Sequence, residues 1–386
     1  MTRCDVIIVG GGLVGTAAAI ALSNAGLDVA LVAHRRMTSA SASRSSSAVP
    51  FDNRVFALRQ GAKRFLSEIG VWSKVDQKRI EQVVRMHIDL FKDNSLIFDA
   101  YDAGVTELAT IVENRNLEES LESRFNAGTS FKCIAANVVS VSQNEGYVKI
   151  DSTAGVVTGK LLIAADGSNS SIRRLCNFDT SEHDYGCHGI VGNFEVDKAH
   201  HGTAYQSFGS GDTLAFLPLP GRRVSMVWTA PNELKNRGAE DKIMSLVKSR
   251  FDPLGIKELI TPIKTFPLYR RNPQSIVFGR VVLVGDAAHQ FLPIAGQGLN
   301  LGFADIEEFL EVSKGYNKGD VGAASILARY RRTRKEEVAS FSLLTHWAHT
   351  LCAKDSSSVH KMQEIVMKAI NKSARLKKLF IDYAVG

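Results

Sequence analysis

Short apolar runs flank a stretch of small residues within the first 33 residues of the chain. Residues 4–10 (CDVIIVG) predict a buried strand, residues 13–26 (LVGTAAAIALSNAG) an alanine-rich helix ended by a glycine, and residues 27–33 (LDVALVA) a second strand. Strands that are joined through a crossover helix pair in parallel. The N-terminus is therefore predicted to form a βαβ unit.

The pattern changes after this unit. Residues 37–50 (MTSASASRSSSAVP) are rich in serine and have no apolar period, which is typical of a loop. In residues 52–72 (DNRVFALRQGAKRFLSEIGVW) the apolar positions return at near-helical spacing, which indicates a helix. These positions are Phe56, Leu58, Phe65, Leu66 and Ile69.

The middle of the chain predicts a different architecture. Short β-prone runs, separated by Gly, Asp and Pro, fill residues 179–273 and indicate an antiparallel sheet. A buried parallel strand returns within residues 279–289 (GRVVLVGDAAH), and the chain after Gly298 is mostly helical. The expected fold class is thus α/β, with an antiparallel ligand domain inserted into a nucleotide-binding domain.

The expected domain boundaries follow from these changes of pattern. The nucleotide-binding domain takes residues 1–72, 105–178 and 274–330. The substrate domain takes residues 73–104 and 179–273, and a helical region closes the chain at 331–386.

Charge and cysteine content narrow the class of protein. The chain has 47 Lys and Arg against 40 Asp and Glu, and its net charge of +7 suits an acidic ligand or an anionic membrane surface. The charge is too diffuse to indicate nucleic acid, and no nucleic-acid-binding motif is present. The five cysteines include no C-x-x-C pair, so neither a disulfide framework nor a zinc site is indicated, and the cytoplasm is the expected compartment. The uncharged run 6–22 is interrupted by glycines, which argues against a signal peptide or a membrane span.

Candidate chemistry begins at the first strand–helix turn. Gly10, Gly12 and Gly15 have the spacing G-x-G-x-x-G, which lets a pyrophosphate approach a helix N-terminus. A carboxylate usually follows about 20 residues later and binds a ribose hydroxyl. Here that position holds Ala33, and basic residues come next: His34, Arg35 and Arg36. A dinucleotide site is predicted, and FAD and NADP both remain open at this point.

A second motif follows the apolar run 161–165, which delivers Asp166 and Gly167 to the end of a predicted strand. Ligands bind at this edge of open α/β sheets. Ser168, Asn169 and Ser170 are candidate caps for the next helix, and Arg173 on it is a candidate phosphate ligand. The alternative is an ordinary turn capped by Asp166.

A third motif repeats this arrangement. Gly285 and Asp286 end a buried strand, and a second glycine cluster, Gly296 and Gly298, opens a helix. Two aspartates at strand ends and two helix N-termini suit a long ligand that has several hydroxyls and a phosphate bridge. That ligand is more extended than NADP requires, and a helix N-terminus would stabilise the anion of a reduced flavin.

These residues resemble the class A flavoprotein monooxygenases of the para-hydroxybenzoate hydroxylase fold, and within them the subfamily that hydroxylates ubiquinone precursors. The resemblance is carried by DNRVFAL (52–58), IVENRNLEESL (111–121), AADGSNSSIR (164–173), FLPLPG with VWT, TFPL, GDAAH…PIAGQGLNLG…D (285–305) and LKKLFIDYAVG at the end. The resemblance implies a Rossmann-like FAD-binding domain of the glutathione-reductase type, with the antiparallel substrate domain inserted and helices at the C-terminus.

The resemblance also implies roles for individual residues. By this resemblance, the first glycine motif binds the ADP part of FAD and Asp286 binds the ribitol hydroxyls. The glycine cluster of the third motif lines the flavin ring. The implied cofactor-binding set is Gly10, Gly12, Gly15, Arg54, Asn114, Asp166, Gly167, Asp286, Pro293, Gly296, Gln297, Gly298, Leu299 and Asn300. The sequence departs from the family pattern at Ala33, where the acidic ribose ligand is missing, and at Leu292, where relatives often have histidine.

The implied reaction rests on the cofactor. NADH or NADPH reduces FAD, the reduced flavin takes up O2 as a C4a-hydroperoxide, and its distal oxygen attacks an electron-rich phenol, so no catalytic nucleophile or metal is required. His346, His349 and Cys352 lie three apart but lack a fourth metal ligand, and His289 is expected to have a structural role.

The substrate side of the prediction rests on apolar positions. Phe216, Pro218, Trp228, Leu268 and Leu292 are candidates for lining an apolar pocket, although the alternation among them is equally typical of a sheet core. The expected substrate is a small, prenylated aromatic molecule.

The C-terminus suggests a membrane contact. Residues 361–380 place apolar and basic residues at helical spacing, which indicates either a docked helix or a basic helix resting on anionic lipid. Peripheral contact at the inner face of the membrane and association with other ubiquinone-biosynthesis proteins are therefore hypotheses. The alternatives for function are a hydroxylase of another aromatic molecule and a non-catalytic family member that binds lipid or protein.

Overall fold

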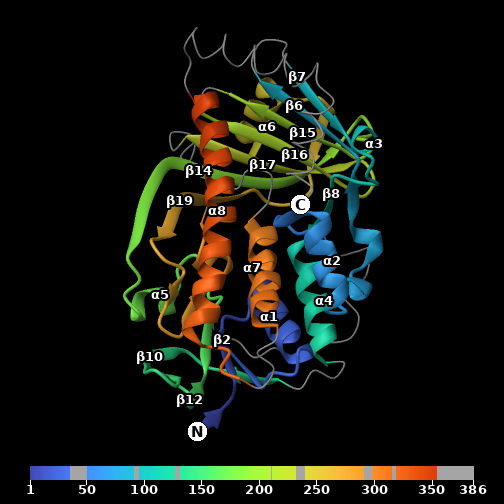
Figure 1. Ribbon diagram of the computed structural model, residues 1–386. Coiled ribbons are helices and arrows are strands. Elements are labelled where there is room, and N and C mark those ends of the chain that lie inside the picture. The colour runs from blue at the N-terminus through green and yellow to red at the C-terminus, as the bar shows by residue number, and fades with distance from the viewer. Residues whose placement is uncertain are drawn as a thin grey trace.

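The computed structural model describes residues 1–34, 50–90, 95–126, 131–209, 211–231, 240–290, 298–314 and 319–353 (Figure 1). Side chains are described as far as residue 338. Arg35, Arg36, Leu292, Pro293, Gly296, Gln297 and the C-terminal segment 361–380 lie outside the described residues, as do the side chains of His346, His349 and Cys352.

The centre of the nucleotide-binding half is a six-stranded sheet whose inner strands are parallel. Its order is β20 (Val277–Phe278), β21 (Val281–Leu283), β13 (Leu161–Ala164), β2 (Val6–Val9), β3 (Val29–Ala33) and β9 (Lys132–Ala135). Only β20 runs antiparallel to its neighbour. Strands β2, β3, β13 and β21 are buried along their whole length, which explains their unbroken apolar runs. The predicted N-terminal βαβ unit is confirmed.

Helices cover this sheet and share one apolar core with it. They are α1 (Leu13–Asn24), α2 (Gln60–Glu68), α4 (Asn114–Asn126), α5 (Ser171–Leu175), α7 (Gly298–Ser313) and α8 (Ala324–Ala353). Helix α8 runs along the molecule from the side of β20 toward the second large sheet (Figure 1). No helix in the described ranges is long and apolar enough to cross a membrane.

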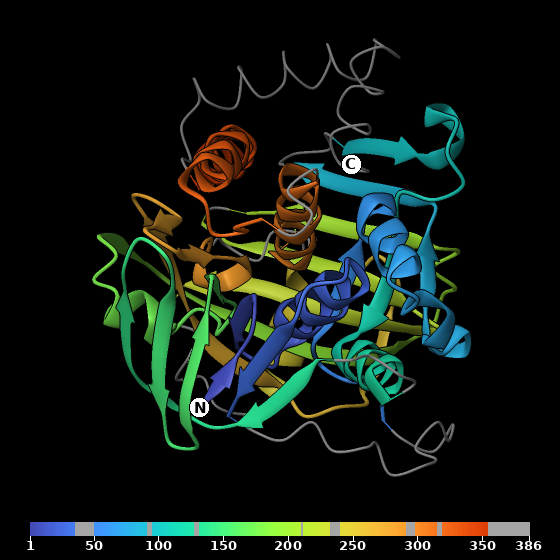
Figure 2. The same cartoon turned by 60° about the horizontal axis from the view of Figure 1, so that its bottom comes forward.

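A small four-stranded sheet lies beside the six-stranded sheet (Figure 2). It consists of β1 (Thr2–Arg3), β12 (Gly155–Gly159), β11 (Val148–Ser152) and β10 (Val138–Gln143). Strand β12 pairs in parallel with β1 and leads at Lys160 directly into β13, so this sheet fixes where β13 enters the main sheet.

The other half of the molecule is an eight-stranded, mainly antiparallel sheet, as predicted for residues 179–273. Its order is β18 (Ile256–Leu259), β14 (Thr180–Val196), β17 (Arg223–Pro231), β16 (Thr213–Leu219), β15 (Thr203–Phe208), β6 (Arg85–Leu90) and β7 (Ser95–Asp99), with β19 (Lys264–Pro273) paired to β14. Helix α6 (Glu240–Arg250) packs on one of its faces. The other face turns toward the rest of the chain.

A three-stranded sheet connects the two halves. It has the order β4 (Val55–Leu58), β8 (Ala109–Glu113) and β5 (Glu81–Val83), and the short helices η1 (Trp72–Lys74), η2 (Gln77–Arg79) and α3 (Ala100–Ala103) lie near it in the chain. The helix expected over residues 52–72 is only partly correct, because Val55–Leu58 form a strand and α2 begins at Gln60. Periodicity cannot separate a short, fully buried strand from a helical segment.

Candidate functional site

The glycine-rich turn after β2 brings three segments of backbone together. Gly10 has φ +117°, and a Cβ there would lie 2.2 Å from the carbonyl oxygen of Ala165. A Cβ at Gly15 would lie 1.9 Å from the carbonyl oxygen of Gly10, whereas Gly12 faces open space. No side chain caps Gly12 at the start of α1 within the described structure. The first N–H groups of α1 are therefore open to an anionic ligand.

The end of β3 supplies no carboxylate to this turn. Ala33 is buried, and its methyl group lies 2.7 Å from the position that a Cβ at Gly11 would take. The next side chain, His34, lies with Nδ1 2.7 Å from Oδ1 of Asn137. In the described part of this strand end, the usual charged acceptor for a ribose hydroxyl is thus absent.

The carboxylate of Asp166 forms its hydrogen bonds within the turn that follows β13. It accepts hydrogen bonds from Oγ of Ser170 at 2.5 Å, from N and Oγ of Ser171 at 2.7 and 2.9 Å, and from N of Ile172 at 3.1 Å. Gly167 follows with φ +79°. These hydrogen bonds fit the alternative interpretation, in which Asp166 stabilises its own turn. The backbone of this turn lies against Gly10 at Ala165.

Arg173 does not face an open phosphate position, so the expectation for this residue is wrong. It is buried, and its guanidinium donates to the carbonyl oxygens of Ala287 at 2.8 Å and Ser168 at 2.6 Å. Burial, together with the positive charge of Arg271, lowers the pKa of Arg173. Arg173 ties the turn after β13 to the third motif, where η4 (Gly285–Ala287) lies.

Asp286 is the open carboxylate of the site. Its side chain is exposed, and Oδ1 lies 3.8 Å from the position of a Cβ at Gly298, at the start of α7. Although the side chain is open to solvent, the protein around it reduces its hydration, and this desolvation raises the pKa of Asp286 above its usual value. The positive charges of Arg54 and His289 oppose that rise. An ionised Asp286 is an acceptor for ligand hydroxyls.

Arg54 and Asn114 lie on the same side as Asp286. The Arg54 side chain is exposed, with its guanidinium carbon 5.2 Å from the ring centre of Phe56. The backbone N–H of Asn114 donates to the carbonyl oxygen of Arg54 at 2.9 Å. The structure thus brings together Arg54, Asn114, Asp286 and Gly298, which are far apart in the sequence.

The side chain of Asn300 forms hydrogen bonds with the backbone of the segment that follows Arg54. Its Oδ1 accepts from the backbone N–H of Arg59 at 3.0 Å, and its Nδ2 donates to the carbonyl oxygen of Ala57 at 2.9 Å. Leu299 is buried in the main core. These two residues attach the segment after Arg54 to α7, and in these positions their side chains do not line an open cleft.

A buried ionic cluster lies behind the third motif and was missed from the sequence. Asp305, fully buried on α7, accepts from the N–H of Gly285 at 2.8 Å and from Nε of Arg334 at 2.7 Å, and lies 3.3 Å from Nε2 of His289. Burial acts to raise the pKa of Asp305, but the charges of Arg334 and His289 outweigh it and hold that pKa below its usual value. The structural role expected for His289 fits this cluster.

Two of the apolar pocket candidates belong to a core elsewhere. Phe216 and Trp228 pack with Ile243 and Val247 of α6, on the face of the large sheet that turns away from the nucleotide-binding half. Leu268 is buried beside Cys187, and Pro218 is also buried. The sheet-core alternative therefore applies to Phe216 and Trp228, because strand alternation sends them to the α6 side.

The opposite face of the same sheet carries polar groups. Asn193 and Ser225 are paired across β14 and β17, and Nδ2 of Asn193 donates to the carbonyl oxygen of Asp52 at 3.0 Å. Oδ1 of Asn193 and Oγ of Ser225 are buried and have no hydrogen-bond partner among the described residues. This face therefore looks toward the segment that carries Arg54.

Comparisons with known proteins show the family and the fold of this chain. Ubiquinone hydroxylase UbiL of Rhodospirillum rubrum is 28% identical over 99% of this chain and 89% of its own, and 3-demethoxyubiquinol 3-hydroxylase of Escherichia coli is 26% identical over 99% and 98%. The crystal structure of p-nitrophenol 4-monooxygenase PnpA from Pseudomonas putida has a TM-score of 0.77 at 18% identity, covering 100% of this chain and 99% of that one. The predicted fold class is thereby confirmed. The FAD binding domain model matches residues 3–340, and the chain belongs to the FAD binding domain family.

Proposed function

We propose that the protein is an FAD-dependent monooxygenase that hydroxylates an aromatic ring, its substrate being a polyprenylated phenol of ubiquinone biosynthesis. One structural observation carries the proposal. The glycine turn after β2, the open Asp286 beside Arg54, and the start of α7 meet at the carboxyl edge of one parallel sheet, where such sheets bind ligands. The ubiquinone hydroxylases that match nearly the whole chain support the substrate class.

The residues at this edge fit FAD. Close backbone packing at Gly10 and Gly15 and the uncapped start of α1 suit the pyrophosphate. Asp286 suits the ribitol hydroxyls, and Arg54 supplies a positive charge beside them. We assign the same cleft to the other expected ligands, Gly12, Asn114, Gly167 and Gly298, and to Pro293, Gly296 and Gln297 outside the described residues.

Bound FAD supplies the redox chemistry between NADH or NADPH, O2 and the aromatic ring. The residues of this chain position that chemistry. Arg173 and Asp305 hold the two strand-end turns in place through Ala287 and Gly285, and Asn300 holds residues 57–59 against α7. The remaining requirement, a site that excludes water, we assign to the region between the two halves of the molecule.

The aromatic substrate is assigned to the sheet face opposite α6. Asn193 and Ser225 place polar atoms there, and Leu217 and Val227 add apolar surface on the same side. A phenol with a prenyl tail needs both kinds of contact. Leu292 remains a candidate for the lining.

Location and partners follow from the substrate class. A prenylated phenol resides in the membrane, so we propose a cytoplasmic protein with peripheral contact at the inner face of the membrane, through the basic C-terminal segment, and association with other ubiquinone-biosynthesis proteins. The domain division 1–72, 105–178 and 274–330 against 73–104 and 179–273, with the helical region 331–386, belongs to the same proposal.

The decisive experiment is complementation of strains that each lack one ubiquinone-ring hydroxylase, with the accumulated intermediate identified by mass. Growth on respiratory medium together with disappearance of one intermediate is the expected result. The purified protein should also consume NADH or NADPH with a stoichiometric yield of hydroxylated product. A yellow protein that consumes reductant without this product would point to a reductase or a hydroxylase of another aromatic molecule. A protein that never takes up FAD would point to the non-catalytic alternative.

A further inference from the structure

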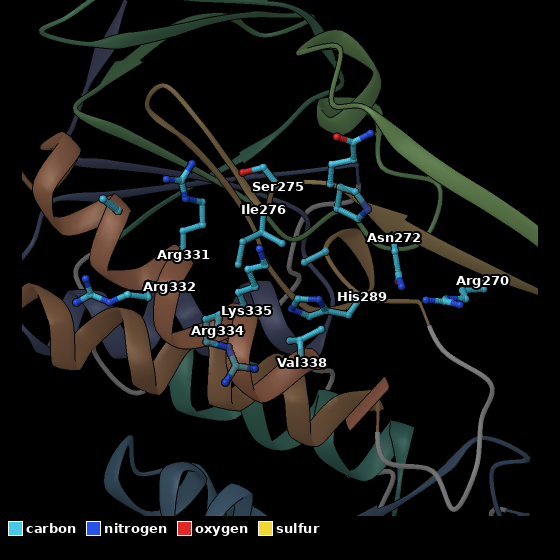
Figure 3. A pocket seen from close by; sticks show the side chains of 14 residues that line it. Arg270, Asn272, Ser275, Ile276, His289, Arg331, Arg332, Arg334, Lys335 and Val338 are labelled. Atoms are coloured by element: carbon cyan, nitrogen blue, oxygen red, sulfur yellow. The ribbon is translucent and has the colours of Figure 1, made fainter. Parts of the chain in front are cut away.

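A cavity of about 920 Å³ lies between the first half of α8, the end of β19 and the residues that follow η4 (Figure 3). Cavities of roughly 300–1,000 Å³ typically hold drug-sized ligands. Among the described residues that line it, none belongs to the set assigned to FAD. Ala288 and His289 form part of its wall, so the cavity borders the third motif.

The lining is strongly basic. It includes five cationic side chains and, within the described structure, no aspartate or glutamate; the cations are Arg270, Arg331, Arg332, Arg334 and Lys335. Asp305 neutralises Arg334. Arg331, Arg332 and Lys335 are exposed, and none of them forms a hydrogen bond or ion pair in the part of the chain that the structure describes. A concave surface lined by one sign of charge concentrates ligands of the opposite sign.

Two of the cations, Arg331 and Lys335, extend toward the same part of the cavity, whereas Arg332 and Arg334 point away from it (Figure 3). Arg331 and Lys335 are one helical turn apart on α8, and Figure 3 shows both extending toward the loop that carries Ser275 and Ile276. Arg270 lies on β19, on the other side of His289 (Figure 3). Like charges at this helical spacing destabilise a helix, so an anion bound between Arg331 and Lys335 would stabilise α8.

The cavity also has an apolar part. Ile276 and Ala288 are buried in its floor, and Val338 contributes from the next turn of α8. A ligand that matches the whole surface therefore has an anionic group for the arginines and a carbon skeleton for this floor. Guanidinium groups bind phosphate oxygens in pairs, which makes phosphate the anion that matches the arginines best.

We propose that this cavity is a binding site for an organic phosphate, separate from the FAD cleft. The phosphate lies between Arg331 and Lys335, and the carbon portion contacts Ile276 and Ala288 on the way toward Arg270. A pyridine dinucleotide and the headgroup region of an anionic phospholipid both have this chemistry. Binding of either class of phosphate compound would support the proposed site.

Isothermal titration calorimetry of the purified, FAD-loaded protein tests the proposal with three probes: NADP+, a short-chain phosphatidylglycerol below its micellar concentration, and inorganic pyrophosphate. Arg331→Glu and Lys335→Glu are compared with wild type and with Arg329→Glu, a matched charge reversal at an exposed position of α8 outside the cavity. We expect an organic probe to bind with a Kd that rises about tenfold or more in each cavity variant and stays unchanged in the control. Binding should also weaken as NaCl is raised.

The possible results of the titration either support the proposed site or overturn it. Binding of NADP+ or of the lipid that depends on Arg331 and Lys335 supports the site and identifies its source. Binding of pyrophosphate alone, binding that the cavity variants leave unchanged, or no binding at millimolar concentration overturns the proposal. If the glutamate variants fail to fold, Arg331→Gln with Lys335→Gln removes the charges without reversing them. The titration needs no turnover, so a failed hydroxylation assay leaves this result intact.

Discussion

The guanidinium of Arg334 on α8 lies fully buried against the carboxylate of Asp305 on α7, with Nε 2.7 Å from Oδ1. The other oxygen of Asp305 accepts the N–H of Gly285, one residue before Asp286. The backbone at the proposed ribitol contact is thus held by an ion pair whose two members lie on later helices, Asp305 on α7 and Arg334 on α8.

Replacing Arg334 with methionine should destabilise the protein by about 3–5 kcal/mol, because Asp305 would remain as a buried charge whose main partner is gone. Chemical denaturation followed by circular dichroism measures this change. Arg329→Met on the exposed side of α8 is the control and should change stability by less than about 0.5 kcal/mol. A loss below 1 kcal/mol for Arg334→Met would mean that water or His289 compensates Asp305.

The same pair predicts acid sensitivity. The pKa of Asp305 is depressed in the folded protein, so the stability that its ionised form contributes is present above the unfolded pKa of about 3.9 and is lost as the pH falls through the lower folded value. We therefore expect unfolding free energy to decline below about pH 4. In Asp305→Asn the low-pH decline should be shallower, from a lower starting stability. Parallel slopes in the two proteins would assign acid unfolding to other carboxyl groups.

The aspartates of the second and third motifs should fail in different ways. Asp286→Ala should abolish FAD retention with little loss of stability, since this carboxylate is exposed. Asp166→Ala should cost about 1–2 kcal/mol of stability, because the first N–H groups of α5 lose their acceptor while Ser170 remains as the N-cap. Bound flavin is measured by absorbance after gel filtration, and stability by denaturation. An Asp286→Ala protein that keeps its full FAD content would contradict the assignment of the third motif.

FAD affinity should depend on pH through Asp286. Its pKa is raised in the protein, and the ionised form accepts hydroxyl hydrogen bonds more strongly than the protonated form does. Affinity should therefore be full above that raised pKa and fall as the pH drops through it, at a higher pH than an ordinary aspartate with pKa about 3.9 would require. Fluorescence quenching of FAD measures the dissociation constant across pH, and Asp286→Asn should remove this dependence. An identical pH profile in Asp286→Asn would place the titrating group elsewhere.

Ala33→Glu should tighten FAD binding. A charged acceptor for a ribose hydroxyl contributes roughly 1.5–3 kcal/mol, or about 10- to 150-fold in affinity. Because Ala33 lies against Gly11, the new side chain must extend away from that glycine and toward the open side of the turn. Ala33→Gln, which has the same length without the charge, should give a smaller gain. Unchanged affinity in Ala33→Glu would show that the ribose is bound by another group.

The sequence predicted those parts of the fold that depend on local patterns. Unbroken apolar runs and glycine spacing were enough for β2, α1, β3, β13 and β21, because each is encoded within one segment of chain. Val55–Leu58 were misread, since a buried strand of four residues has no period of its own.

Residue roles were less predictable, because the partners of a polar side chain are set by tertiary contacts. Asp166 and Asp286 look alike in sequence, yet one caps its own helix and the other faces solvent. The side chains of Arg173 and Asn300 hydrogen-bond to backbone carbonyls and an N–H of distant segments, and no sequence pattern predicts these contacts. Phe216 and Trp228 alternate correctly for a sheet, but alternation does not say which face covers the ligand and which faces α6.

The strand order carries a consequence for biosynthesis. Ile163, on β13, pairs with Ile8 on one side and Val282 on the other, so the middle of the sheet joins the beginning of the chain to its last third. Contacts of such long sequence separation form slowly. During synthesis, one edge of β2 in the N-terminal βαβ unit stays unpaired until β13 emerges. The proposed FAD site is incomplete until β21 and α7 have left the ribosome. The proposed FAD site is therefore assembled only in chains that extend beyond α7, and a product truncated before β21 would have the glycine turn but lack Asp286.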